Sequence, residues 1–373
     1  MIKRFHTYKG NLHMGHQLEP TRIGARAIDV GYFNVKYTTG RNNESNNEVG
    51  CGLFPALAPR ITHNNSLMSP GTSGSDGCYV NVDGVNYFVG RGAAFNSSGL
   101  ETRPVEKSYC MSDKYLALLR GALHYIAEDA KATQDVVIDQ LVLGLPLNNF
   151  KEFHERLVDR VVGEHHLTSP KAAAGKRRIT VKNARVIVQP QGALINFGYN
   201  GATKVADGWT LVIDPGGGTL DWFLSRGNQP NWQRSGAYPK SMLACSYAVA
   251  DMINPGWKDQ FEIIDRIDKA IRSKADTFSV AGETYTLSNY QTGIEAVLEE
   301  SVQYMLNSIG PTDSLDTIIM TGGGAKVFYE YMATHHPRLA KIATIDNDPV
   351  FSNVRGFHIL GEMFINRHSG NKP

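Results

Sequence analysis

The alternation of hydrophobic and polar positions in the first half of the chain predicts short strands, polar loops and two helices. Apolar and β-branched residues at 26–30 and 32–38 indicate two strands that turn through Gly31. Apolar residues at helical spacing predict a helix over 114–130. The other elements expected in this half are polar loops at 40–48 and 63–76, a hairpin over 78–90 turning at Asp83-Gly84, a strand at 136–145, a helix at 150–162, a basic turn at 176–178 and a strand at 184–188.

The second half repeats this plan. A strand at 209–213 runs into a glycine-rich turn, and a strand at 220–225 returns from it. Later come helices at 241–253 and 261–273, a hairpin over 277–287 around Gly282, a helix at 291–309, a strand at 317–320 and a helix at 355–365. The repetition predicts two α/β lobes with mixed sheets that face one another across a cleft. The expected division is a flexible leader at 1–22, lobe I at 23–205 with an insertion near 50–110, and lobe II at 206–373 with an insertion near 236–305.

Composition narrows the class of protein. The 373 residues are 42% hydrophobic and 20% charged, which are globular proportions, and the net charge of +2 is too balanced for a protein that neutralises a phosphate backbone. Four well-separated cysteines with no C-x-x-C pair favour a reducing cytoplasm. No apolar run approaches the about 20 residues of a membrane helix, and the leader has no secretory pattern. We therefore expect a cytoplasmic protein that contacts neither nucleic acid nor membrane directly.

The segment V-I-D-P-G-G-G-T-L-D at 212–221 carries the sharpest chemical signal. Asp214 ends an apolar strand, and the chain then turns through Gly216, Gly217 and Gly218. Glycines let several backbone N–H groups point into one small volume, as a phosphate-binding loop requires. A carboxylate beside phosphates is favourable when a hard cation such as Mg²⁺ lies between them. The alternative is an ordinary hairpin in which the aspartate caps the turn.

Three weaker motifs accompany it. In A-I-D-V-G-Y-F-N-V-K at 27–36, an aspartate again ends a strand before a glycine, and Lys36 on the return strand is a candidate phosphate contact. The turn T-G-G-G-A at 321–325 offers a surface without side chains for a base and ribose, whereas the P-loop and dinucleotide patterns are absent. In V-Q-P-Q-G at 188–192, Gln191 can orient an attacking water, with Gln189 as the competitor for that role.

These motifs stand in the order found in the actin-like ATPase superfamily, which the chain resembles from about residue 27 to residue 364. The closing P-V-F-S-N-V-R-G-F-H-I-L-G at 349–361, F-P-A-L-A at 54–58 and Y-F-V-G-R-G-A at 87–93 resemble the ParM/StbA branch of plasmid-segregation proteins. The resemblance implies the actin-like ATPase fold, an α/β fold of two related lobes with smaller insertions around a nucleotide cleft.

The resemblance also implies a role for each matching residue. Asp29 and Asp214 would hold Mg²⁺ through water, and Gln191 would position the attacking water. The remaining nucleotide contacts would be Gly31, Asn34 and Lys36 on one side of the phosphates, Gly216, Gly217, Gly218 and Thr219 on the other, and Gly322, Gly323 and Gly324 against adenosine.

The expected activity is ATP hydrolysis coupled to filament turnover. ATP closes the lobes, the closed form polymerises, and hydrolysis to ADP weakens the filament, while a centromere-binding adaptor protein holds the DNA. Two alternatives remain open at this point: a small-molecule kinase of the same superfamily, with Asp221 as the nearest carboxylate base, and a non-polymerising ATP-binding scaffold.

Overall fold

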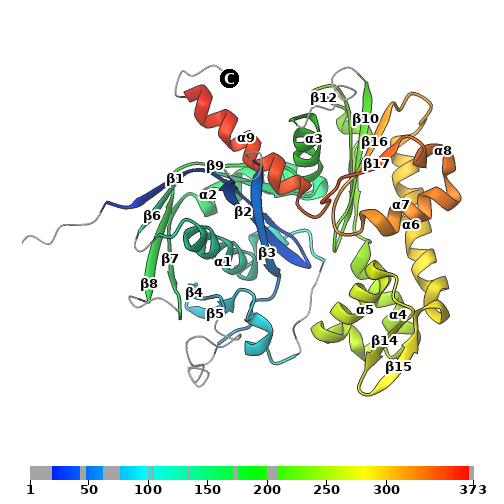
Figure 1. The fold of residues 1–373 in the computed structure, drawn as a ribbon, viewed down its shortest axis with the longest axis horizontal. Coiled ribbons are helices and arrows are strands. Elements are labelled where there is room, and N and C mark those ends of the chain that lie inside the picture. The colour runs from blue at the N-terminus through cyan, green and yellow to red at the C-terminus, as the bar shows by residue number, and fades with distance from the viewer. Residues whose placement is uncertain are drawn as a thin grey trace, which may run out of the picture.

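The computed structural model describes residues 19–42, 48–61, 76–99, 101, 105–132, 135–170, 175–199 and 208–368. These residues form two α/β lobes that lie side by side, lobe I at 19–199 and lobe II at 208–351 (Figure 1). Most of the predicted leader, most of the loops at 40–48 and 63–76, and the expected lobe boundary at 205–206 lie outside the described residues. The first strand begins at Thr21, slightly before the expected end of the leader.

Lobe I is built on a mixed sheet with the strand order β3-β2-β1-β6-β8-β7-β4-β5, and β9 also pairs with β6. Strand β1 runs antiparallel to β2 and parallel to β6, so the sheet is mixed as the pattern predicted. The strands are β1 (Thr21–Val30), β2 (Asn34–Arg41), β3 (Val49–Pro55), β4 (Cys78–Val82), β5 (Val85–Val89), β6 (Val136–Leu145), β7 (Gly163–Thr168), β8 (Lys176–Val181) and β9 (Ala184–Val188). The helices of this lobe are α1 (Asp113–Asp129), α2 (Leu147–Val161) and α3 (Gln189–Tyr199).

Lobe II repeats the central arrangement on a smaller sheet ordered β12-β11-β10-β16-β17, with β13 beside β11. Strand β10 is antiparallel to β11 and parallel to β16, which matches β1 between β2 and β6 in lobe I. The elements are β10 (Trp209–Pro215), β11 (Leu220–Arg226), β12 (Gln229–Pro230), β13 (Gly236–Tyr238), α4 (Met242–Ile253), α5 (Phe261–Ser273), β14 (Thr277–Val280), β15 (Glu283–Thr286), α6 (Gln291–Ile309), β16 (Thr317–Met320), α7 (Ala325–His335), α8 (Pro337–Ala340) and β17 (Ala343–Ile345).

The last helix, α9 (Ser352–His368), leaves lobe II and packs against α3 and the β1–β6 part of lobe I (Figure 1). A polar network fastens it there: His358 Nδ1 lies 2.9 Å from Thr38 Oγ1, and the Arg41 guanidinium is paired with the Glu362 carboxylate. Burial by itself raises the pKa of Glu362, but hydrogen bonds and positive charge from His358 and Arg41 outweigh it and hold that pKa at about 2.

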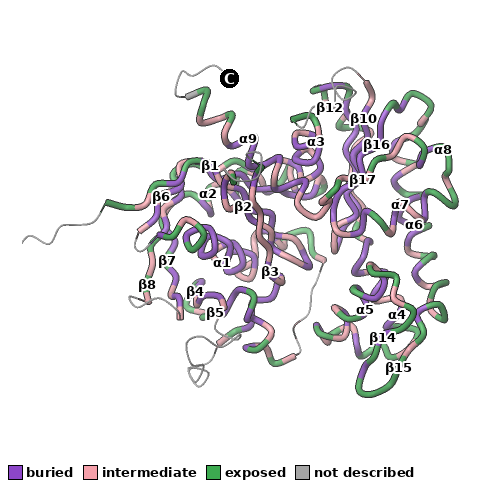
Figure 2. The backbone as a smooth tube through the Cα atoms, viewed as in Figure 1, coloured by how far each residue is buried: buried purple, intermediate pink, exposed green. Residues whose placement is uncertain are grey.

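The hydrophobic core lies within this arrangement of sheets and helices. Buried residues concentrate in α1 and in the central strands of both sheets, while the helices at the edge of lobe II expose one face (Figure 2). The lobes also touch through apolar side chains, because Phe261 at the start of α5 joins Leu57, Phe88 and Ala93 of lobe I in one buried cluster. The lobes are therefore in direct apolar contact as well as linked by the chain.

Several elements were predicted to the residue, namely β6, β9, α5, α6 and β16, and the hairpin turn at Asp83-Gly84 has the positive φ angles expected of it. Strand β3 and helix α7 were not predicted. The glycines at 50 and 52 break the apolar pattern of β3, but they leave room for the side chains of Thr39 and Tyr37 on its partner strand.

The predicted basic turn at 176–178 is wrong, because these residues lie on strand β8. Arg177 is paired with Glu128 at 2.7 Å and Arg178 with Asp135 at 2.5 Å. Carboxylates of the same lobe thus neutralise the two arginines of this basic segment.

Candidate functional site

The site lies where two glycine turns meet, one from each lobe. The β1–β2 turn of lobe I places the rings of Tyr32 and Phe33 against the β10–β11 turn of lobe II. A Cβ atom on Gly218 would overlap the Tyr32 ring, and one on Gly217 would overlap the Phe33 ring. These two glycines are therefore required by the close approach of the lobes, a reason that the sequence motif did not reveal.

Asp29 ends β1 and is 1% exposed. Its carboxylate accepts two hydrogen bonds, from Lys36 Nζ at 2.9 Å and from Gln189 Nε2 at 2.6 Å. Lys36 comes from the return strand β2 and Gln189 from the first turn of α3, so three elements of lobe I converge on one carboxylate. Gln191 lies in the same first turn of α3 and is half-buried. The structure thus brings Gln189, the competitor, into contact with Asp29.

Asp214 ends β10, at the position in lobe II that corresponds to Asp29 in lobe I. Its Oδ2 accepts a hydrogen bond from Asn353 Nδ2 at 2.6 Å, and its Oδ1 lies over Gly322, where a Cβ would overlap it. The pKa of Asp214 is raised to about 6, mainly by burial and further by the negative charge of Asp29. The charge of Lys36 and the hydrogen bond from Asn353 act in the opposite direction. The two aspartates therefore interact electrostatically across the lobe interface.

Asp221 is buried behind the same turn. Its two carboxylate oxygens accept hydrogen bonds from Thr219 Oγ1 at 2.6 Å and from the backbone N–H of Leu147 at 3.0 Å. Burial raises its pKa to about 7. Because Asp221 and Thr219 belong to lobe II and Leu147 to lobe I, Asp221 links the lobes through Oδ1 alone.

The third glycine turn, Gly322–Gly324, packs against the end of β10. The N–H of Gly324 donates to the carbonyl of Pro215 at 2.9 Å, and Gly322 has a φ of +77°, which favours glycine. The guanidinium of Arg272 on α5 covers Gly323 and also lies 5.3 Å from the centre of the Phe33 ring. Arg272 and Phe33 together lie between the two glycine turns of lobe II.

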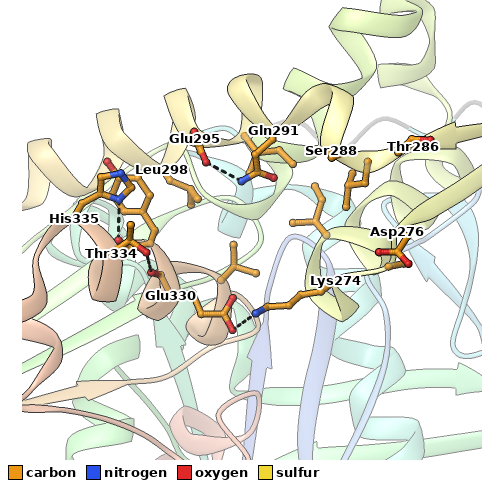
Figure 3. A pocket seen from close by; sticks show the side chains of 16 residues that line it. Lys274, Asp276, Thr286, Ser288, Gln291, Glu295, Leu298, Glu330, Thr334 and His335 are labelled. Carbon is orange, nitrogen blue, oxygen red and sulfur yellow. Dashed lines mark hydrogen bonds and ion pairs between the residues drawn. The ribbon is translucent and has the colours of Figure 1, made fainter.

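One cavity lies between the lobes, and a larger one lies within lobe II. A small one of about 30 Å³ lies between the lobes and is lined by Tyr32, Gln189 and Gly218 among others. A larger one of about 620 Å³ lies in lobe II between the end of α5 and helices α6 and α7, with Ile271 and Val327 among its lining residues (Figure 3). Lys274 and Glu330 form an ion pair of 2.6 Å at its edge. None of Gly322–Gly324 lines the larger cavity; its lining residue nearest in sequence to that turn is Val327 on α7.

The carboxylate oxygens of Asp29 and Asp214 are ligands that suit a hard cation. The groups that contact these oxygens are the side-chain nitrogens of Lys36, Gln189 and Asn353. Within the described ranges, no three acidic, histidine or cysteine residues are close enough to share a metal ion. A metal at this position would therefore take water ligands, and its binding to Asp29 and Asp214 through water stays a prediction. Sequence reasoning missed Phe33, Arg272 and Asn353, although Asn353 stands in the S-N-V-R-G-F motif.

With this geometry in place, comparisons with known proteins show which fold the chain has. Residues 27–192 match the family described as the N-terminal domain of actin-like proteins. Among solved structures, the chain is similar to the actin-like protein Alp7A (14% identity, 94% of this chain and 98% of that chain, TM-score 0.71). It is also similar to a ParM from Clostridium botulinum in a 15-stranded filament (19% identity, 93% and 100%, TM-score 0.69). A third is the archaeal actin homologue Ta0583 in complex with ADP (17% identity, 91% and 100%, TM-score 0.67).

The chain therefore has the actin-like fold, and the part of its first lobe at 27–192 is similar to the N-terminal domain of the actin-like proteins. The predicted actin-like fold is confirmed, and ParM and Alp structures are among the neighbours that share it. No curated protein matches the chain by sequence closely enough to count as a relative. None of the helices in the described ranges has an apolar stretch that would reach across a bilayer.

Proposed function

We propose that this chain is an ATPase that polymerises with ATP into dynamic filaments for the segregation of plasmid DNA. The observation that carries the proposal is the convergence of two equivalent strand–aspartate–glycine turns, one from each lobe, on a single interface. A ligand bound between such turns touches both lobes, so its binding free energy depends on how closely they approach. A filament-forming ParM and an ADP-bound actin homologue with the same fold support the proposal.

We assign each residue of the site a role in nucleotide binding or hydrolysis. Lys36 supplies positive charge to the phosphates, and the backbone N–H groups of the turn at 216–219 supply hydrogen bonds. Asp29 and Asp214 hold Mg²⁺ through water, and Gln191 orients the attacking water. Mg²⁺ bound to the phosphates would neutralise the charge that develops during phosphoryl transfer. Because Gln189 hydrogen-bonds Asp29, its role is to fix that carboxylate, which leaves Gln191 for the water.

We place the base and ribose along Gly322–Gly324, with the base directed toward the 620 Å³ cavity of lobe II. The side chains of Arg272 and Phe33 cover this path in the structure. Nucleotide entry then requires the lobes to separate and the Arg272 side chain to move. The aliphatic lining residues of the cavity, such as Ile271 and Val327, suit the faces of a purine.

The filament would be a homopolymer that carries DNA through a centromere-binding adaptor. The ion pairs of Arg177 and Arg178 support the absence of direct nucleic-acid contact, because these arginines are already neutralised. The four cysteines are free thiols, which suits the cytoplasm. A kinase is less well supported, because both oxygens of Asp221 are engaged within the protein and the carboxylate is 1% exposed.

Light scattering and sedimentation of the purified chain with ATP, ADP, a non-hydrolysable ATP analogue or no nucleotide test the proposal. We expect a concentration threshold with ATP and the analogue, a higher threshold with ADP, and no ATP hydrolysis by Asp214→Ala. GTP in a parallel series establishes the preferred base. A chain that stays monomeric with ATP at tens of micromolar while phosphorylating a small alcohol would refute the filament and establish the kinase.

A further inference from the structure

Asn353 connects the C-terminal helix to the aspartate that ends β10. It is the second residue of α9 and lies in the S-N-V-R-G-F motif, to which the proposed function gives no role. Its side-chain amide donates to Asp214 Oδ2 at 2.6 Å, and both residues are 5% exposed. Among the described atoms, the side-chain oxygen of Asn353 has no hydrogen-bond partner. The polar contact that this buried amide makes is therefore the one to Asp214.

The position of this amide is set by helix packing. Helices α3 and α9 cross with their backbones in contact, because a Cβ on Gly356 would overlap the carbonyl of Gly192. The carbonyl of Asn353 itself lies against Gly192 in the same crossing. Gly192 follows Gln191 directly, so one helix crossing fixes the residue that holds Asp214 and the residue proposed to orient the water. Such fixed partners hold a carboxylate in one orientation.

Burying an amide costs free energy unless it is hydrogen-bonded. A purely structural asparagine would meet that requirement at any buried acceptor, as Asn196 of α3 does by donating to Asp346 Oδ2 at 3.1 Å. Asn353 instead donates to one oxygen of Asp214 while the other oxygen lies over Gly322. Asp214 is thereby held from both sides, facing the lobe interface where Asp29 lies opposite.

We propose that Asn353 is a positioning residue for Asp214, which orients the carboxylate for Mg²⁺ bound with the nucleotide. This inference rests on the proposed nucleotide site, but it adds a residue outside the three glycine turns. Residues that orient a metal-binding carboxylate typically contribute 10- to 100-fold to metal affinity. We therefore expect Asn353 to act on the metal-dependent part of nucleotide binding and to leave the metal-independent part unchanged.

Calorimetry of ATP binding, with excess Mg²⁺ and with EDTA, tests this on the full chain. Asn353→Leu keeps the side-chain bulk and removes the donor, and Asn196→Leu makes the same change at the matched control position. We expect Asn353→Leu to lose about 10-fold or more of the affinity gained from Mg²⁺, with no change in EDTA. Asn353→Ser, which retains a shorter donor and serves if the leucine variant does not fold, should fall between. The control should retain the full gain.

The outcomes separate the two proposals. Equal Mg²⁺ gains in the Asn353 and Asn196 variants, in folded protein as judged by circular dichroism, would overturn the role of Asn353 while the proposed function stands. A wild-type chain that binds ATP equally well with Mg²⁺ and with EDTA would overturn the metal site itself. A wild-type chain that binds no ATP would overturn the proposed nucleotide function and this inference with it.

Discussion

Replacing Gly356 with alanine should destabilise the protein, although alanine is the better helix former. Gly356 is buried in the interior of α9, and a Cβ there would overlap the carbonyl carbon and oxygen of Gly192 on α3. Those are backbone atoms, so no change of rotamer relieves the overlap and the helices must move apart. Overpacking a core costs about 1–3 kcal/mol, and we expect the upper end here because backbone must shift.

The intrinsic preference of a helix for alanine over glycine offsets about 1 kcal/mol of this cost. The net loss in the free energy of unfolding is then about 2 kcal/mol. For a domain of lobe I's size, each kcal/mol lowers the Tm by about 2–4 °C, so the expected shift is about 4–8 °C downward. Circular dichroism at 222 nm during heating measures it.

The matched control is Gly198→Ala on α3. Gly198 is exposed, and a Cβ there would meet no atom within 4 Å. The same chemical change should therefore stabilise this variant by up to about 1 kcal/mol, a rise in Tm of a few degrees. Opposite signs for the two variants are the expected result. A Gly356→Ala protein with an unchanged or raised Tm would refute the backbone contact between α3 and α9.

Three further changes test the site and the attachment of α9. Gln191→Ala should retain ATP binding but slow hydrolysis ~10²-fold or more, because water positioning is lost rather than affinity; an unchanged turnover number, with a slowed Gln189→Ala, would move the role to Gln189. Gly323→Val should weaken ATP binding measured by calorimetry while the circular dichroism spectrum stays unchanged, and normal binding would show that this turn does not face adenosine. Because folding lowers the pKa of Glu362 to about 2 from an ordinary 4.5, the carboxylate adds stability above pH 4.5 that is lost as the pH falls toward 2. Glu362→Gln should flatten this slope in urea titrations between pH 2 and 5, and an unaltered slope would contradict the assignment.

The sequence by itself determined the elements whose pattern is local. Strands β6, β9 and β16 and the helices α5 and α6 follow from apolar periodicity, and the glycine turns follow from residues that permit tight backbone approach. The order of those turns also indicated the actin-like fold, which structure and comparisons confirm. Local patterns were sufficient here because strand alternation and helical spacing depend on near neighbours in the chain.

Tertiary structure decided which residues share a site. Gln189 and Gln191 are equivalent in sequence, and only the orientation of α3 brings Gln189 to Asp29. Asn353 lies 139 residues from Asp214 in the chain, and the crossing of α3 and α9 brings them together. Glycines interrupt the apolar pattern of strand β3, and the structure explains them, because side chains of the partner strand β2 occupy the space beside them.

The glycines of the β10–β11 turn show most clearly how a prediction from sequence differs from what the tertiary structure decides. Their sequence predicts a phosphate-binding loop, whereas the structure gives Gly217 and Gly218 a second reason to lack side chains, the rings of Phe33 and Tyr32 from the opposite lobe. The residue pattern of one segment predicts which backbone conformations that segment can adopt and how closely other atoms can come to it. It does not predict which side chains contact the segment, because that depends on how the two lobes pack against each other.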